Sequence, residues 1–342
     1  MPVHPFEPAA GRIETIYVES KALEGNLLGD PTRRAVAVYL PPGYDESDVE
    51  YPLFVDLAGF TSSGLKHVGW QSFGENLPQR VDRLIASGKM GPVILVFPDG
   101  FTTLGGNQYI DSPVFGNWEQ FLVDEMIPLL ESRYRVRKGA GHRAVFGKSS
   151  GGYGAMIQGM RHGDRWAGIA SHSGDTGFDI IYRGDLYGAL DALAEHDGDV
   201  GAFMADLQEA RTIGGDQFHV LMTLAMAATY DPDRSAPYGV RLPVDLQTGA
   251  MDRERWGRWL SHDPLTLVEL PATQESLRRL KGLFIDCGSR DQYRMHYGVR
   301  ALVRRLEALG IEHHYEEFDG THSGIDHRMD VSLPFLYAAV SD

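Results

Sequence analysis

The stretch "VFGKSSGGYGA", from Val145 to Ala155, sets two adjacent serines among four glycines behind an apolar run. Its centre, "GKSSG" from Gly147 to Gly151, matches the pattern G-x-S-x-G. "RAVFGKSS" predicts a strand that enters a tight turn, and "GGYGAMIQGM" predicts a helix that leaves it. That context is typical of a nucleophile elbow, in which a strained serine stands at the carboxyl end of a sheet strand.

The two outer glycines have a steric reason. Side chains at Gly147 and Gly151 would collide across so tight a turn. Ser149 is therefore the candidate nucleophile, and Ser150 is expected to lend its backbone N–H to an oxyanion hole beside the helix N-terminus. The alternative is a glycine-rich turn without chemistry.

A serine hydroxyl needs a base before it can attack. After such an elbow the partners follow in the order acid then histidine, each beyond the end of a later strand. "LFIDCGSRDQY" places Asp291 just after a strand, and "YEEFDGTHSG" places His322 after the last one. One helix and one strand fit between them, so we expect Ser149, Asp291 and His322 to form a catalytic triad.

Other residues compete for these roles. Asp286 lies within its strand and is expected to point into the structure, and Asp319 is too close in sequence to His322. His172, in "ASHSG", precedes the acid, which is the wrong order for a base, although it could reach the rim of the site. Cys287 is expected to be a small buried hydrophobe.

The second oxyanion donor should come from the loop after the third strand, "LAGFTSSG". We expect the backbone N–H of Phe60 to fill this role, and an ordinary strand-end turn is the alternative. Trp118 and Tyr109 flank the loop before the nucleophile strand and are, with His172, candidates for the substrate rim. Since no H-E-x-x-H motif or cysteine cluster occurs, we predict no metal and no cofactor.

The order of elements predicts the fold class. Strands alternate with helices through residues 1–173 and 271–342, which favours a mostly parallel sheet with helices on both faces. Residues 174–270 show helical periodicity without buried-strand runs and are predicted to form an inserted helical cap. The apolar residues of its stretch "FHVLMTLAMAATY" suit the cap's own core or an oligomer interface better than a substrate pocket.

Composition and charge limit the classes of partner that the chain could bind. The chain has 342 residues, a formal net charge of −15 and one cysteine. The negative charge disfavours nucleic acid and anionic membrane surfaces as partners, and no apolar stretch is long enough to span a membrane. No secretory signal is recognisable, so a cytoplasmic protein is expected, with a processed secreted form as the alternative. The sequence is compatible with both a monomer and a homo-oligomer.

With these residues in place, the chain resembles the esterase D-like group of α/β-hydrolases, which includes enterochelin esterases, feruloyl esterases and mycolyl transferases. The segments "VYLPPGYDES", "GKSSGGYGA", "SHSG", "DCGSRDQY" and "GTHSG" occur in the order of that group. Two features depart from it. Ala58-Gly59 replaces the usual His-Gly or Ser-Gly before the oxyanion residue, and the cap is longer than the family core requires.

The resemblance and the triad order together predict a serine carboxylic-ester hydrolase that forms an acyl-enzyme on a small-molecule ester. Acyl transfer to an alcohol by the same residues is one alternative. A non-catalytic binding protein on the same scaffold is another.

Overall fold

Eight strands build the central sheet of the computed structural model, which describes residues 4–341. Their order is β1-β2-β4-β3-β7-β8-β9-β10, and all neighbours pair in parallel except β1 with β2 and β2 with β4. The strands are β1 (Arg12–Glu19), β2 (Arg33–Leu40), β3 (Leu53–Leu57), β4 (Ile94–Pro98), β7 (Arg143–Lys148), β8 (Gly168–His172), β9 (Gly282–Gly288) and β10 (His314–Phe318). The predicted mostly parallel sheet is confirmed. A separate two-stranded hairpin joins β5 (Asp111–Ser112) to β6 (Gly116–Asn117).

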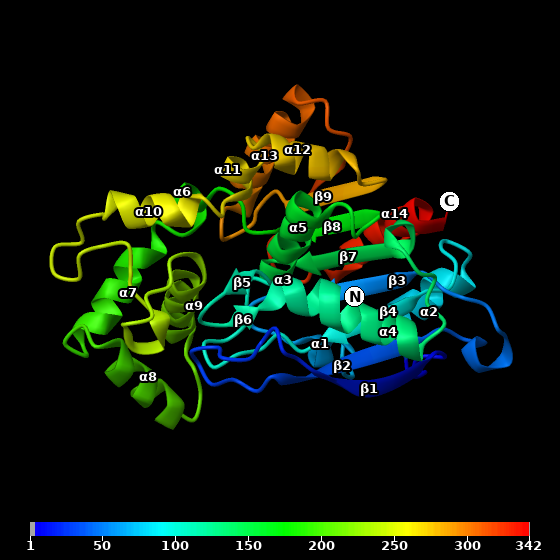
Figure 1. The fold of residues 1–342 in the computed structure, drawn as a ribbon, viewed down its shortest axis with the longest axis horizontal. Coiled ribbons are helices and arrows are strands. Elements are labelled where there is room, and N and C mark those ends of the chain that lie inside the picture. The colour runs from blue at the N-terminus through cyan, green and yellow to red at the C-terminus, as the bar shows by residue number, and fades with distance from the viewer. Residues whose placement is uncertain (1–3, 342) are drawn as a thin grey trace.

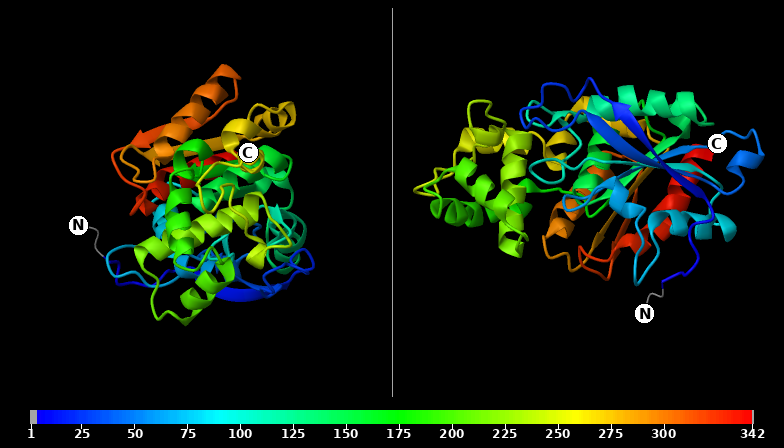
Figure 2. Two further views of the ribbon diagram at one scale, coloured as in Figure 1. Left: turned by 90° about the vertical axis from the view of Figure 1, so that its left-hand side faces the viewer. Right: turned by 90° about the horizontal axis from the view of Figure 1, so that it is seen from below.

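Helices cover both faces of the sheet (Figures 1 and 2). The first face carries the helical segment α3 (Trp118–Gln120), η2 (Phe121–Met126) and α4 (Ile127–Arg133), together with α5 (Ser150–His162) and α13 (Met295–Ala308), while α12 (Pro271–Arg278) packs against α5. The second face carries α2 (Leu77–Ala86) and α14 (Met329–Ser341). A short helix, α1 (Gly64–His67), contacts β2 and β4.

The central strands explain why two faces are covered. Successive side chains of a strand point to opposite faces of its sheet, and on β3 Phe54 joins the cluster under α2 and α14 while Val55 joins the other cluster. Every residue of β3, β4 and β9 is buried. Continuous apolar runs of this kind are typical of parallel strands with helices on both sides.

The segment between β8 and β9 is helical, and it adds no strand to the sheet in the described part of the chain. Figure 1 shows most of its helices beside the sheet, at the end next to the hairpin β5–β6. The helices of this segment are α6 (Phe178–Ile181), α7 (Asp185–Ala194), α8 (Val200–Glu209), α9 (Gly215–Tyr230), the short η4 (Pro237–Gly239), α10 (Arg253–Leu260), α11 (Pro264–Leu267) and α12.

This helical segment shares its core with the sheet domain. The ring centroid of Tyr153, on α5, lies 6.1 Å from that of Phe178 and 5.9 Å from that of Tyr230, and Tyr230 lies 5.6 Å from Trp259. All four rings belong to the same buried cluster as the first face of the sheet. The helices are therefore packed onto the domain by aromatic contacts.

Within residues 4–341, no helix combines the length and the apolar character that crossing a bilayer requires.

Candidate active site

The turn between β7 and α5 has the strained geometry that its glycines predict. Ser149 has φ 58° and ψ −125°, a positive-φ conformation that costs a non-glycine residue free energy. Two backbone hydrogen bonds hold it there: the Ser149 N–H donates to the His172 carbonyl at 2.9 Å, and the Ser149 carbonyl accepts from the Tyr153 N–H at 2.8 Å. The backbone of β8 and the first turn of α5 therefore fix the serine.

Neither Gly147 nor Gly151 could carry a side chain, because a Cβ at either position would clash with neighbouring backbone atoms. A Cβ on Gly151 would lie 1.8 Å from the Leu57 carbonyl oxygen, and a Cβ on Gly147 would lie 2.5 Å from the same atom. The Gly147 Cβ would also meet the Gly151 carbonyl carbon at 2.5 Å. The elbow packs directly against the end of β3, so the predicted steric role of both residues is confirmed.

Asp291 and His322 form a buried pair. The His322 Nδ1 lies 2.7 Å from the Asp291 Oδ2, and the two residues are 8% and 4% exposed. The Asp291 Oδ1 accepts the Tyr293 N–H at 2.9 Å, and the Tyr293 ring meets the His322 ring edge to face at 4.8 Å. These contacts fix the orientation of the Asp291 carboxylate, which in turn holds the Nδ1 of His322.

Contact between two loops brings this pair together. The Ser289 N–H donates to the Phe318 carbonyl at 2.8 Å, and the Arg290 N–H donates to the Gly320 carbonyl at 2.9 Å. A Cβ on Gly288 would lie 2.6 Å from the Gly320 carbonyl oxygen. The loop after β9 can therefore lie directly against the loop after β10, as the parallel pairing of these two strands requires.

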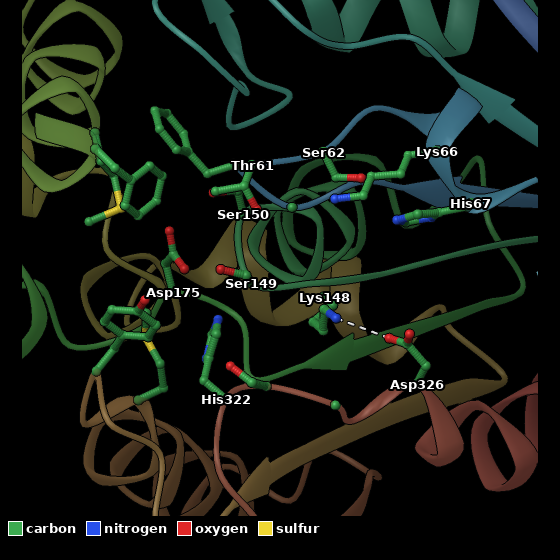
Figure 3. Close-up of a pocket in the computed structure, with 18 of the residues that line it drawn as sticks. Thr61, Ser62, Lys66, His67, Lys148, Ser149, Ser150, Asp175, His322 and Asp326 are labelled. Carbon is green, nitrogen blue, oxygen red and sulfur yellow. Dashed lines mark hydrogen bonds and ion pairs between the residues drawn. The ribbon is translucent and has the colours of Figure 1, made fainter. Parts of the chain in front are cut away.

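Ser149 and His322 line one cavity of about 360 Å³. Figure 3 shows the Ser149 hydroxyl and the His322 ring directed toward the same space, with Asp175 on one side and the group Lys66, His67, Lys148 and Asp326 on the other. The three residues predicted as a triad are thus brought to one place, with the acid behind the histidine.

The two predicted oxyanion donors also lie beside Ser149. Phe60 and Ser150 line the cavity, and within residues 4–341 neither N–H donates to a backbone carbonyl. A Cβ on Gly59 would lie 3.1 Å from the Lys148 carbonyl oxygen, so the loop after β3 passes close to the elbow. Ser150 begins α5, where a helix leaves its first N–H groups free.

The prediction of rim positions for Trp118, Tyr109 and His172 is wrong. Trp118 is fully buried, and its Nε1 donates to the Phe115 carbonyl at 3.1 Å. The Tyr109 hydroxyl, also buried, donates to the Ala58 carbonyl at 2.9 Å. None of the three is among the described residues that line the cavity, because each turns inward to satisfy its polar atom within the fold.

His172 belongs to a structural network with the rejected acid. Its Nδ1 lies 2.7 Å from the Asp286 Oδ1, and its Nε2 lies 2.9 Å from the Ser332 Oγ. The Asp286 Oδ2 accepts the Arg328 Nε at 2.8 Å, and Asp286 is fully buried. Cys287 is buried as well, and this burial raises the pKa of its thiol.

Several cavity residues are missed by the sequence patterns. At the helical end, Ile181 and Tyr182 reach the cavity from the end of α6, and Phe218 and Met222 reach it from α9. The remaining apolar residues of α9 are mostly buried in the core, as expected. Asp175, after β8, carries no motif that distinguishes it from a turn residue.

The opposite end of the cavity is polar. The Lys148 Nζ lies 3.0 Å from the Asp326 Oδ1, and the His67 Nδ1 contacts the buried carboxylate of Asp56. Burial lowers the pKa of His67, but the charge and the hydrogen bond of Asp56 outweigh it and the net shift is upward. Lys66 lies at this end as an exposed side chain.

Comparison with known proteins identifies a matching family and a related curated protein. The family model named Esterase matches residues 30–331. A protein of Mycobacterium tuberculosis (strain ATCC 25618 / H37Rv) named esterase Rv1288 is 30% identical over 145 residues, which are 41% of this chain and 28% of that protein. The chain therefore matches less than a third of the length of this relative.

Solved structures show the same fold. A ferulic acid esterase superposes with a TM-score of 0.63 at 20% identity, covering 96% of this chain and 98% of that one. An S-formylglutathione hydrolase from Agrobacterium tumefaciens superposes with a TM-score of 0.57 at 17% identity, covering 98% and 97%. Both similarities concern the α/β-hydrolase fold. Because the family model spans most of the sequence, the chain belongs to the Esterase family.

Proposed function

We propose that this chain is a serine carboxylic-ester hydrolase that acts through an acyl-enzyme intermediate. The observation that carries the proposal is the buried Asp291–His322 pair opening onto the same cavity as a strained, cavity-lining Ser149. Membership of the Esterase family supports the same reaction class.

In the first half of the reaction, His322 takes the proton of the Ser149 hydroxyl as its oxygen attacks the ester carbonyl. The N–H groups of Phe60 and Ser150 donate hydrogen bonds to the oxyanion that forms. Backbone donors held in place before the reaction stabilise this developing charge most effectively. His322 then gives its proton to the leaving alkoxide, and the acyl group stays on Ser149.

In the second half, His322 takes a proton from water, which attacks the acyl-enzyme carbonyl. His322 then returns this proton to the Ser149 Oγ as the bond between Ser149 and the acyl group breaks and the acid leaves. Asp291 holds the His322 Nδ1 throughout, which fixes the tautomer with its Nε2 free to act as base and stabilises the imidazolium. This assignment of the ring nitrogens follows from the 2.7 Å contact between Asp291 and His322.

We propose further that residues 174–270 act as a cap over one end of the cavity. Ile181, Tyr182, Phe218 and Met222 come from this segment and supply apolar walls near the nucleophile. Such walls exclude water from the part of the site that holds the substrate.

The test compares wild-type protein with Ser149→Ala on p-nitrophenyl acetate and butyrate. Ser132→Ala, on the exposed face of α4, is the matched control. We expect Ser149→Ala to lose kcat by at least about a thousandfold, and Ser132→Ala to keep the wild-type rate. A fluorophosphonate should label wild-type protein at Ser149. Turnover in Ser149→Ala equal to that of wild type would refute the proposed mechanism.

A further inference from the structure

Asp175 is a buried carboxylate at the edge of the cavity, three residues beyond the end of β8. It is only 4% exposed, yet it lines the cavity that contains Ser149 and His322. Figure 3 shows its carboxylate on the side of Ser149 opposite Lys148. The proposed reaction gives this acid no role, because Asp291 already holds His322.

Asp175 is incompletely satisfied by the protein. Its Oδ2 accepts the Tyr182 hydroxyl at 2.5 Å and the Gln108 Nε2 at 3.2 Å. Its Oδ1 is buried and has no hydrogen-bond partner among the described residues. A buried carboxylate oxygen without a donor costs folding free energy, so a further donor would be bound favourably here.

The hydrogen bonds that Asp175 already accepts favour a donor rather than an acceptor as the missing partner. Burial raises the pKa of Asp175, the Tyr182 and Gln108 hydrogen bonds and the nearby His322 lower it, and the net shift is upward. Two donors converge on one oxygen, which is the environment of a hydrogen-bond acceptor. A hydroxyl or ammonium group would complete the set.

The position of Asp175 limits where that donor sits on a substrate. The Gln108 Nε2 that donates to Asp175 also lies 2.9 Å from the Ser150 Oγ. Asp175 is thus two hydrogen bonds away from the residue that follows the nucleophile. This short relay favours a donor attached close to the ester carbonyl.

The two ends of the cavity differ in a way that separates the acyl group from the leaving group. At the end near Asp175, Ile181 and Tyr182 are buried, and Phe218 and Met222 are half-buried. The polar end includes the exposed residue Lys66. The leaving group must depart and water must enter while the acyl group stays bound, so the enclosed end suits the acyl group.

Resting on the ester hydrolysis proposed above, we infer that Asp175 is a specificity-determining residue for the acyl group. It binds a hydrogen-bond donor, hydroxyl or ammonium, carried on the α- or β-carbon of an otherwise apolar acyl chain. The substrate class is therefore esters of α- or β-hydroxy acids or of amino acids.

The experiment uses four ethyl esters of one carbon skeleton: 3-phenylpropanoate and its 2-hydroxy, 2-methoxy and 2-amino derivatives, with each enantiomer assayed separately. The 2-hydroxy and 2-methoxy esters are electronically similar, but only the first can donate a hydrogen bond. Assays near pH 6.5 keep most of the amino ester protonated.

We expect wild-type kcat/KM to favour the 2-hydroxy or 2-amino ester over the 2-methoxy ester by about tenfold to a hundredfold, as a hydrogen bond to a charged group implies. In Asp175→Asn this ratio should fall to within about threefold of unity. A larger loss for the amino ester than for the hydroxy ester would identify a cation as the preferred donor. The matched control is Asp191→Asn, which removes one charge from the exposed face of α7 and should keep the wild-type ratio.

The outcomes separate this inference from the proposed function. Equal wild-type rates on the 2-hydroxy and 2-methoxy esters would overturn the role of Asp175 while leaving ester hydrolysis intact, and this comparison needs no variant to fold. A donor preference that survives in folded Asp175→Asn would also overturn it. If wild-type protein hydrolyses none of the esters used here or in the p-nitrophenyl assay, the proposed function fails and this inference fails with it.

Discussion

The His322 Nδ1 lies 2.7 Å from the Asp291 Oδ2, across two loops that touch where Gly288 has no side chain. The second carboxylate of the same region, Asp286, pairs with a different histidine, His172, at the same distance. Two histidine–aspartate pairs therefore lie side by side in the fold. Only His322 reaches the cavity, and His172 is enclosed by β8, β9 and α14.

The two pairs predict opposite effects of the same chemical change. Asp291→Asn should lower kcat for p-nitrophenyl butyrate by about a thousandfold or more, because an amide cannot fix the tautomer or stabilise the imidazolium, with little change in unfolding free energy. Asp286→Asn should instead cost about 3 kcal/mol of stability by leaving the buried Arg328 without one of its carboxylates. Urea unfolding and steady-state kinetics of both variants check this. If kcat fell in Asp286→Asn and not in Asp291→Asn, the catalytic role assigned to Asp291 would be wrong.

The elbow predicts a steep steric penalty at one glycine. Gly151→Ala places a methyl group 1.8 Å from the Leu57 carbonyl oxygen, so β3 and α5 must move apart or the turn must change shape. We expect loss of most soluble protein or of all activity. Gly188→Ala is the control: a Cβ there meets nothing within 4 Å on α7, and it should stabilise the protein by about 0.5–1 kcal/mol. Full activity in Gly151→Ala would contradict the packing of the elbow.

Features set by local chemistry can be predicted from this sequence. The strand, turn and helix around Ser149 follow from an apolar run, a steric requirement at two glycines and a helix start, all within a dozen residues. Asp291 and His322 follow from the order of elements, because parallel strands bring their carboxyl ends to one edge.

Features set by packing between distant segments cannot be predicted in this way. Trp118 and Tyr109 lie beside a polar loop in the sequence, which suggested an exposed rim, but their rings pack against each other at 6.3 Å beneath it. Asp175 differs from an ordinary turn residue only through Tyr182 and Gln108, which reach it from other elements. No periodicity or motif carries that information.

The burial of Trp118 predicts a stability effect without a substrate effect. Trp118→Phe loses the hydrogen bond to the Phe115 carbonyl and part of the contact with the Phe121 ring at 5.1 Å. It should lower the unfolding free energy by about 1–3 kcal/mol and leave KM for p-nitrophenyl butyrate within twofold of wild type. Phe218→Leu, which changes a cavity wall, should shift KM by more than that. A large change of KM in Trp118→Phe would contradict this and indicate that Trp118 contributes to the substrate site.

His262 predicts a pH dependence of stability. Its ring nitrogen lies 3.5 Å from the Arg161 Nη2, and its ring centroid lies 5.4 Å from that of Tyr230. Burial, and then the positive charge of Arg161, lower the pKa of His262 to about 4, against smaller opposite effects of Glu119 and Asp231. In the unfolded chain its pKa returns to the ordinary value of about 6.5.

The sign follows from which state binds the proton. Between pH 6.5 and 4 the unfolded chain is protonated at this site and the folded chain is not, so acid favours unfolding. The contribution of His262 is fully present above pH 6.5 and is lost progressively toward pH 4, with a slope of at most about 1.4 kcal/mol per pH unit.

Urea unfolding of wild type and His262→Gln at several pH values isolates this contribution, because the other titrating groups are common to both. The variant should show a shallower fall in stability with acid, whereas His327→Gln, at an exposed position, should follow wild type. Parallel curves for wild type and His262→Gln would mean that this histidine is not held neutral by its surroundings.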